Sequence, residues 1–377
     1  MIGLEKRKKP VTLITGYLGS GKTTVMNGLL KKQSGKKTAL IVNDMGSINL
    51  DADLLKKGNV AQIDTKMIEL QNGCICCTLR DEFMEQIEQL SREEEIEAVL
   101  VEASGISNPA SIADCFLMYE ETHKNSPVYL NSIITVVDAD RIYAEFLAEL
   151  EELHNREDEN EEDPDIINLV MDQIEFCDLI LLNKCDLLKE EQVLKVKAVL
   201  RQLQPEADIL ETVHGKVEAG LILNEKRFDY EKVSNSSAIQ KALAREAKAD
   251  RGEQEEYGIS SFVYEERRPF DYDAFIEFME KEYPENIIRA KGYVWFSDDD
   301  IHVQLFEQAG RNSSITEVSN WIAALDQEEQ KEVFEEYPEV LEEWDVTYGD
   351  RMNQIVFIGR GYDEAKIRKQ LDNCIKA

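Results

Sequence analysis

Residues 10–24 read PVTLITGYLGSGKTT, and this stretch decides the fold. The apolar run at 11–15 predicts a buried strand, and the residues from 22 onward have the apolar spacing of a helix. Between them, Gly16, Gly19 and Gly21 allow the backbone to turn and to point several N–H groups into one concavity. The spacing fits G-x-x-x-x-G-K-[S/T], a loop that binds phosphate at a helix N-terminus. The alternative is a glycine-rich turn with a chance lysine, which the flanking strand and helix disfavour.

Several side chains of this loop suit the phosphates of a nucleotide. The Lys22 ammonium would neutralise the terminal phosphates, and the Thr23 hydroxyl would bind Mg²⁺. The residues that we expect to hold the phosphates are Gly16, Gly19, Ser20, Gly21, Lys22, Thr23 and Thr24.

The first 225 residues alternate short apolar runs with helical patterns. The runs lie at 11–15, 39–42, 98–101, 133–137, 179–182 and 209–212, and the helical patterns include 22–32, 81–90 and 191–203. Brief runs rich in Val, Ile and Leu, separated by enough chain for a crossover helix, are typical of parallel strands. We therefore expect an α/β P-loop NTPase domain with a mostly parallel sheet, whose ligands bind at the carboxyl ends of the strands.

A second motif follows the fifth run and indicates which base is bound. Asn183-Lys184-Cys185-Asp186 fits N-K-x-D, in which the Asp186 carboxylate can accept hydrogen bonds that guanine offers and adenine does not. We therefore expect GTP as the nucleotide. The alternative is an ordinary polar turn between strand and helix. His214 follows the sixth run, where a loop could pack on the base, and a surface histidine is an equally good interpretation.

Glu102-Ala103-Ser104-Gly105 ends the third run. A carboxylate at this edge can reach Mg²⁺ or its water, and the Gly105 N–H can face a γ-phosphate. The expected catalytic residues are therefore Lys22, Thr23 and Glu102, with Thr23 and Glu102 as magnesium ligands. The alternative is a polar strand end followed by a turn.

Three cysteines lie within four positions, at Cys74, Cys76 and Cys77. Once deprotonated, their thiolates can bind a soft or borderline cation such as Zn²⁺. The spacing is not that of a closed four-cysteine site. Such an incomplete site suits a protein that passes a metal on, and reactive cysteines without metal are the alternative.

Composition limits the class of protein. In 377 residues there are 43 Lys and Arg against 76 Asp and Glu, so the formal net charge is −33. A surface so acidic repels phosphate backbones and anionic membranes, and we therefore expect no nucleic-acid partner and no membrane partner. The apolar run near the start is too short for an export signal, and clustered thiols suit a reducing compartment, so we expect a cytoplasmic protein.

The second half of the chain changes pattern. Strands at 259–264, 290–296, 302–308, 314–318 and 354–358 alternate polar with apolar residues, and helical patterns lie at 271–282, 327–336 and 363–375. This predicts a smaller C-terminal α+β domain, 258–377, whose antiparallel sheet has one wet face. Residues 226–257 are expected to form a linker, and the acidic stretch 151–165 a solvated loop.

Taken together, GYLGSGKTT, CICC, EASG, QIEFCD at 173–178 and NKCD resemble the CobW-type P-loop GTPases. Residues 291–295, 349–353 and 356–359 resemble the C-terminal domain of that family. The resemblance implies GTP hydrolysis coupled to delivery of zinc, or of cobalt (Co²⁺), to a client metalloprotein.

The resemblance also implies that Cys74, Cys76 and Cys77 bind the transition metal, together with Asp44. The family usually has Glu where Asp44 stands, and Ser47 stands where it has a second acidic residue. Many relatives carry a histidine-rich tract near 151–165, where this chain has only His154. We therefore expect a Mg²⁺-dependent GTPase acting as a metallochaperone. The alternatives are a metal-buffering or regulatory GTP-binding protein and a P-loop small-molecule kinase.

Overall fold

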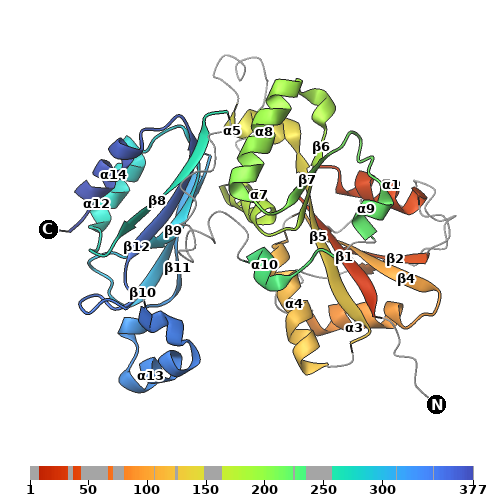
Figure 1. Ribbon diagram of the computed structural model, residues 1–377, viewed down its shortest axis with the longest axis horizontal. Helices are drawn as coiled ribbons and strands as arrows, with labels where there is room; N and C mark the ends of the chain where they lie inside the picture. Colours follow the sequence, from red (N-terminus) through yellow and green to blue (C-terminus); the bar gives the residue numbers. More distant parts are fainter. Residues whose placement is uncertain are drawn as a thin grey trace. The chain divides into compact units, whose positions relative to one another are not determined.

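The computed structural model describes residues 8–32, 37–43, 67–70, 80–105, 107–123, 126–147, 164–223, 226–234, 257–310, 312–342 and 344–376. The chain divides into two compact units, Met1–Ala238 and Ile239–Ala377 (Figure 1). The described residues of the first unit begin red, and those of the second unit end blue.

The first unit contains a seven-stranded sheet whose paired strands are all parallel. Its strands, in the spatial order β3-β2-β4-β1-β5-β6-β7, are β1 (Lys9–Thr15), β2 (Lys37–Asn43), β3 (Met67–Leu70), β4 (Ile96–Glu102), β5 (Val128–Asp138), β6 (Leu179–Asn183) and β7 (Asp208–Glu211). The α/β prediction is confirmed. β3 was not predicted, because four residues are too few to show a period. The three clustered cysteines therefore follow the third strand in the chain and not the second.

Helices lie on both faces of this sheet (Figure 1). They are α1 (Lys22–Lys32), α3 (Arg80–Ser91), α4 (Pro109–Thr122), α5 (Ala139–Phe146), α7 (Pro164–Glu175), α8 (Glu190–Leu203), α9 (Ala219–Leu223) and α10 (Tyr230–Ser234). α1 begins at the end of the glycine loop and buries Val25, Met26 and Leu29 against strand residues such as Ile14 and Leu100. Burying each such side chain stabilises the fold by about 1.5–3 kcal/mol, so α1, which follows the glycine loop, is held firmly against the sheet.

Two further predicted segments fall wholly or partly within this unit. The acidic stretch at 151–163 lies outside the described residues, and Pro164 begins α7, at a helical position where a missing N–H costs little. The start of the expected linker packs on the first unit, because the backbone N–H groups of Arg227 and Phe228 both donate to the carbonyl oxygen of Asn131.

The second unit contains a five-stranded antiparallel sheet in the order β11-β10-β9-β12-β8. The strands are β8 (Ile259–Glu266), β9 (Ile287–Val294), β10 (His302–Ala309), β11 (Asn312–Asn320) and β12 (Asn353–Arg360), and the α-helices are α12 (Tyr272–Glu277), α13 (Gln327–Glu336) and α14 (Glu364–Asn373). β12 lies between β8 and β9, so the unit contains a split βαβ arrangement. An aromatic core that includes Phe262, Phe275, Phe306 and Phe357 fills one face of the sheet.

The expectation of one wet sheet face is wrong for the central strands. Ile355 and Phe357 belong to the aromatic core, whereas Val356 and Ile358 alternate with them and are 1% and 0% exposed. Arg289 on the adjacent β9 is also 0% exposed. The reason is visible in β12, whose run Ile-Val-Phe-Ile is continuously apolar, as in strands that are buried on both faces.

Candidate functional site

The glycine loop between β1 and α1 has the backbone geometry that its sequence requires. Gly16 and Gly21 have φ angles of 134° and 104°, which residues with a Cβ atom rarely adopt. A Cβ atom at Gly16 would lie 2.3 Å from the carbonyl oxygen of Val136, and one at Gly21 would lie 2.3 Å from Asn183 Nδ2. Both glycines are therefore required by conformation and by space.

Lys22 opens α1 and points back into this loop. Its side chain is nearly buried, at 5% exposure for the residue, and Nζ donates to the carbonyl oxygens of Gly16 at 2.8 Å and of Tyr17 at 3.2 Å. The ammonium thus lies within the turn of the loop, where it can meet an anion. Ser20 is buried in the same turn, and Thr24 is exposed one residue beyond Thr23.

Thr23 and Glu102 meet at the carboxyl edge of the sheet. Glu102 ends β4 and pairs in register with Ile14 on β1, which places its carboxylate beside the start of α1. Thr23 Oγ1 donates to Glu102 Oε1 at 3.2 Å, and Glu102 is only 2% exposed. A hydroxyl and a carboxylate at this distance are the hard oxygen ligands that Mg²⁺ prefers, so these residues fit that ion.

The loop after β4 packs against the glycine loop. The Ala103 N–H donates to the carbonyl oxygen of Ile14, and the Ser107 N–H closes a turn onto the carbonyl oxygen of Ser104. A Cβ atom at Gly105 would lie 2.9 Å from the Leu18 side chain and 3.1 Å from the Leu18 backbone nitrogen, so the loop after β4 closely approaches the glycine loop. Gly105 is therefore within reach of a group held by the glycine loop.

Asn183, at the end of β6, ties two loops together. It is 2% exposed, its Nδ2 donates to the carbonyl oxygen of Ser20 at 2.9 Å, and its Oδ1 accepts from the Gly215 N–H at 3.1 Å. The amide thus joins the glycine loop to the loop after β7. We expected Asn183 to contact the nucleotide directly, and here both ends of its amide bind backbone groups.

Lys184 has the left-handed φ of 62°, and its Nζ lies 2.5 Å from Asp138 Oδ2. Asp138 ends β5 and also caps α5 by accepting from the Asp140 and Arg141 N–H groups. Sequence reasoning missed Asp138, although it ends a predicted strand as Glu102 does. Asp186 is exposed in the short 3₁₀ turn Cys185–Leu187, at the edge of the sheet where a base would lie.

His214 lies in the loop after β7 and is exposed, with a left-handed φ of 51°. The neighbouring Thr212 Oγ1 donates to the carbonyl oxygen of Lys216 at 3.0 Å, which closes this loop. Together with Asp186, His214 is a candidate for contact with the base. Its exposure agrees equally well with a surface histidine.

The predicted transition-metal ligands Asp44, Cys74, Cys76 and Cys77 lie outside the described residues. Within the described ranges, no three His, Cys, Asp or Glu side chains gather as a metal site. Burial raises the pKa of the Cys374 thiol to about 11, and it also raises the pKa values of the Cys177 and Cys185 thiols. These three cysteines are therefore protonated at neutral pH and are poor metal ligands.

Asp178 ends the QIEFCD segment and holds the adjacent strand. Its carboxylate accepts from the Ser132 hydroxyl and from the Ile133 N–H, the latter at 2.7 Å. Burial raises the pKa of Asp178 to about 6, although these two hydrogen bonds and the charge of Arg227 act in the opposite direction. Asp178 is at the start of β6, so it lies at the edge of the sheet opposite the glycine loop.

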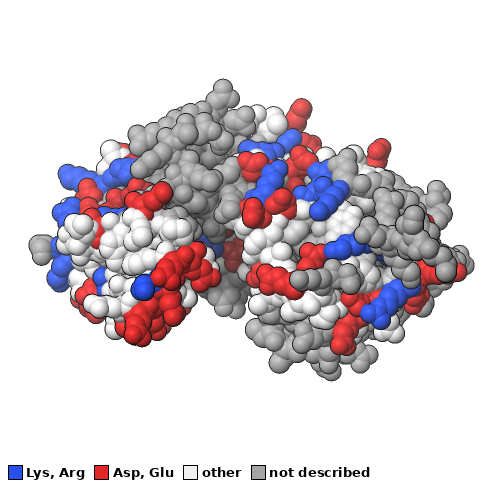
Figure 2. Space-filling view, turned by 60° about the horizontal axis from the view of Figure 1, so that its bottom comes forward, with Lys and Arg blue, Asp and Glu red and all other residues white. Residues whose placement is uncertain are grey.

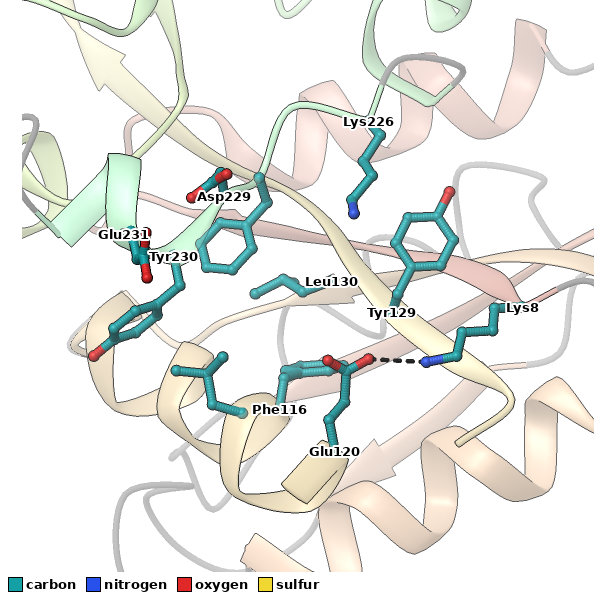
Figure 3. Close-up of a pocket in the computed structure, with 11 residues that line it drawn as sticks. Lys8, Phe116, Glu120, Tyr129, Leu130, Lys226, Asp229, Tyr230 and Glu231 are labelled. Carbon is teal, nitrogen blue, oxygen red and sulfur yellow. Dashed lines mark hydrogen bonds and ion pairs between the residues drawn. The ribbon is translucent and has the colours of Figure 1, made fainter. Parts of the chain in front are cut away.

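A cavity of ≈ 570 Å³ lies at that same opposite edge (Figure 3). Lys226 lies 5.6 Å from the Tyr129 ring centre, and Lys8 pairs with Glu120 at 3.3 Å. Tyr129 is at the start of β5, whereas ligands of open α/β sheets bind at the carboxyl ends of the strands. The cavity is thus separate from the candidate nucleotide site. Its lining consists of Lys8, Phe116, Leu117, Glu120, Tyr129, Leu130, Lys226, Phe228, Asp229, Tyr230 and Glu231.

In the face that Figure 2 shows, acidic side chains form several clusters on the described surface, with Lys and Arg among them. One acidic region is α13, whose sequence QEEQKEVFEE has no buried residue. Among the residues whose structure is described, no helix is both long and apolar enough to cross a membrane.

Comparison with known proteins gives matches along most of the chain. The family model "CobW/HypB/UreG, nucleotide-binding domain" matches residues 10–211, and the model "Cobalamin synthesis protein cobW C-terminal domain" matches 259–375. The zinc-regulated GTPase metalloprotein activator 1 of Dictyostelium discoideum is 32% identical over 98% of this chain and 80% of its own length.

Two further matches are a second relative and a solved structure. The zinc chaperone CobW of a Sinorhizobium species is 31% identical over 76% of this chain and 81% of its own length. The crystal structure of Zn(II)-bound YjiA GTPase from E. coli is 21% identical, covers 98% of this chain and all of its own, and has a TM-score of 0.41.

Proposed function

Because the chain belongs to the CobW/HypB/UreG family of nucleotide-binding proteins, we propose that it hydrolyses GTP and uses the hydrolysis to deliver zinc to a client protein. The observation that supports the GTPase part is the contact between Thr23, which is next to Lys22 in the chain, and Glu102, a hydroxyl and a carboxylate of the kind that Mg²⁺ prefers. The zinc part is supported by the names of relatives, which are a zinc-regulated GTPase metalloprotein activator and a zinc chaperone.

The nucleotide would lie along the carboxyl edge of the first sheet. Its phosphates would meet the backbone N–H groups of Gly16, Gly19, Ser20, Gly21, Lys22, Thr23 and Thr24 at the start of α1, where the helix dipole favours anions. The exposed Asp186 would accept from guanine, and His214 would approach the base from the neighbouring loop. Asn183 and Lys184 would act by holding these loops, through Ser20, Gly215 and Asp138.

Mg²⁺ would be held by Thr23 and Glu102 and would neutralise charge on the phosphate oxygens. The protein's own contribution is positioning. Lys22 would move its ammonium from the loop carbonyls to the terminal phosphates, and the Gly105 N–H would face the γ-phosphate. Attack of water in line with the departing diphosphate then needs little covalent chemistry from the protein.

The proposed metal site consists of Cys74, Cys76 and Cys77, with Asp44 as a further ligand. Thiolates suit zinc, and Co²⁺ would bind the same set. In the chain the cysteines are followed by α3 and then by β4, which ends at Glu102. We further propose a cytoplasmic protein in which 1–225 carry the nucleotide and metal chemistry, 226–257 form the linker and 258–377 a separate domain.

The test combines turnover with zinc affinity in different nucleotide states. Zn²⁺ would be titrated into the full chain against a chromophoric chelator, with a non-hydrolysable GTP analogue and Mg²⁺, with GDP and Mg²⁺, and without nucleotide. We expect the affinity to differ by about 5–150-fold between the triphosphate and diphosphate states, as for a typical coupling free energy. By linkage, zinc must change GTP affinity by the same factor.

Matched variants make this experiment specific. Cys76→Ser with Cys77→Ser should abolish tight zinc binding and leave GTP affinity without zinc nearly unchanged. Cys374→Ser alters a buried thiol of the second unit and should leave both unchanged. Equal zinc affinity in all nucleotide states would rule out coupled delivery and favour a metal-buffering protein. Absence of GTP hydrolysis would rule out the GTPase itself.

A further inference from the structure

Gln173 lies on α7, outside the motifs that bind the nucleotide, yet it contacts the loop after β4. The residue is 1% exposed. Its Nε2 donates one hydrogen bond to the carbonyl oxygen of Gly105 and one to that of Ser107, each at 3.1 Å. An amide nitrogen has two N–H groups, so its whole donor capacity is used on this loop.

The other contacts of Gln173 fix it in place. Its own carbonyl oxygen accepts from the Thr135 hydroxyl on β5 at 2.6 Å. Thr135 pairs in register with Thr15, the last residue before the glycine loop. Gly105 is in turn packed against Leu18 of the glycine loop. Gln173 thus connects the central sheet to the loop whose Gly105 N–H would face the γ-phosphate in the proposed function.

The acceptor end of the same side chain gives a second observation. Within the described part of the chain, Gln173 Oε1 is buried and makes no hydrogen bond, and the same holds for Ser20 Oγ of the glycine loop. Both residues line one small cavity together with Tyr17. A buried acceptor without a partner costs stability, so an amide kept at this position points to a role beyond packing.

We propose that Gln173 is a positioning residue for GTP hydrolysis, which holds the Gly105–Ser107 turn in place relative to the γ-phosphate. The inference rests on the proposed GTPase activity. A donor that is fixed before the reaction needs no reorganisation when charge develops, and this lowers the barrier. GDP has no γ-phosphate, so its binding does not use the turn. Loss of the two hydrogen bonds from Gln173 should therefore lower kcat and leave GDP affinity nearly unchanged.

Gln173→Met and Gln173→Glu test this inference, because both keep the length of the side chain and remove its N–H donors. In the full chain with Mg²⁺, we expect kcat for GTP to fall roughly 10- to 100-fold, as for two lost hydrogen bonds. GDP affinity, measured with a fluorescent GDP analogue, should change less than about threefold. Such a split between kcat and GDP affinity is not expected from a general loss of fold.

Gln204→Met is the matched control. Gln204 is 0% exposed and its Nε2 donates to the carbonyl oxygen of Glu175, the last residue of the same helix α7. This variant removes a buried amide that holds α7 but does not touch the loop after β4, so kcat should stay near the wild-type value.

Several results would overturn the inference. Unchanged kcat in both Gln173 variants would do so, and so would an equal loss of kcat in Gln204→Met. A loss of GDP affinity as large as the loss of kcat would also contradict it. Failure of both Gln173 variants to fold would assign the residue to stability. A wild-type chain that hydrolyses no GTP would overturn the proposed function, whereas normal wild-type turnover with active Gln173 variants would overturn this inference alone.

Discussion

Asn183 and Ser20 lie 163 positions apart in the chain, yet Asn183 Nδ2 donates to the carbonyl oxygen of Ser20 at 2.9 Å. The bond joins the residue that opens the N-K-x-D motif to the glycine loop. The two proposed nucleotide-binding motifs are thus joined by a direct hydrogen bond. A change at Asn183 should therefore weaken binding of the phosphates as well as of the base.

Asn183→Asp should weaken GDP and GTP binding to a similar extent. The carboxylate cannot donate to the Ser20 carbonyl oxygen, and it places a charge where the side chain is only 2% exposed. We expect a loss of roughly 10- to 100-fold for both nucleotides, measured by titration calorimetry, and a lower melting temperature. Unchanged GDP affinity would show that the bond to Ser20 does not support the loop.

Asp186→Asn should change the choice of base and leave the fold intact. Asp186 is exposed, so its replacement removes no buried contact. An amide cannot accept both guanine N–H groups, so GTP affinity should fall about 10- to 150-fold while ATP affinity stays the same. Competition of GTP and ATP against a fluorescent nucleotide measures this, and a thermal melt checks the fold. Retained selectivity for GTP would refute the guanine assignment.

The contrast between these residues shows what sequence can predict here. The parallel strands were predictable because each buried run is apolar on both faces, and the glycine loop because its positive φ angles leave little choice of residue. The direction of the Asn183 side chain was not predictable, because it depends on a carbonyl group that only the folded sheet brings near. Asp138 was missed for a similar reason, since its partner Lys184 lies 46 positions further on, just after β6.

In the second unit, the expectation of a wet face failed because residues 354–358 were interpreted as an alternating strand, whereas β12 contains the continuous apolar run Ile-Val-Phe-Ile. The two donors of Gln173 show the same limit at the site. The QIEFCD segment was recognisable in the sequence. The hydrogen bonds from Gln173 to Gly105 and Ser107 were not predictable, because they depend on where α7 crosses the sheet.

Thr23→Val should make nucleotide binding insensitive to Mg²⁺. Valine has nearly the shape of threonine but lacks the hydroxyl that lies 3.2 Å from Glu102 Oε1. With Mg²⁺ we expect GTP turnover to fall roughly 10- to 100-fold, whereas GDP affinity in EDTA should be unchanged. Thr23→Ser keeps the hydroxyl and serves as the control, with turnover close to wild type. A Thr23→Val protein with a normal Mg²⁺ dependence would exclude Thr23 as a magnesium ligand.

Asp178 should make folding stability depend on pH in an unusual direction. Burial raises its pKa from 3.8 to about 6 in the native state. As the pH rises from about 4 to about 6, the unfolded chain loses this proton first, and the native state binds more protons than the unfolded state. The contribution of Asp178 to the free energy of unfolding is therefore fully present below about pH 4 and lost above about pH 6. The loss is on the order of 2–3 kcal/mol.

Urea unfolding at pH 4.5 and pH 7.5 measures this effect by difference, because the other acidic groups are shared by all the variants. Asp178→Asn does not titrate, and it should be destabilised relative to wild type at pH 4.5 by more than at pH 7.5. Ser132→Ala removes a hydrogen bond that lowers the pKa of Asp178, so the native pKa of Asp178 should rise further. The free energy of unfolding of this variant should begin to fall at the same pH as that of the wild type and should continue to fall above pH 6. If the difference between wild type and Asp178→Asn is the same at both pH values, the Asp178 carboxyl titrates alike in the native and unfolded states.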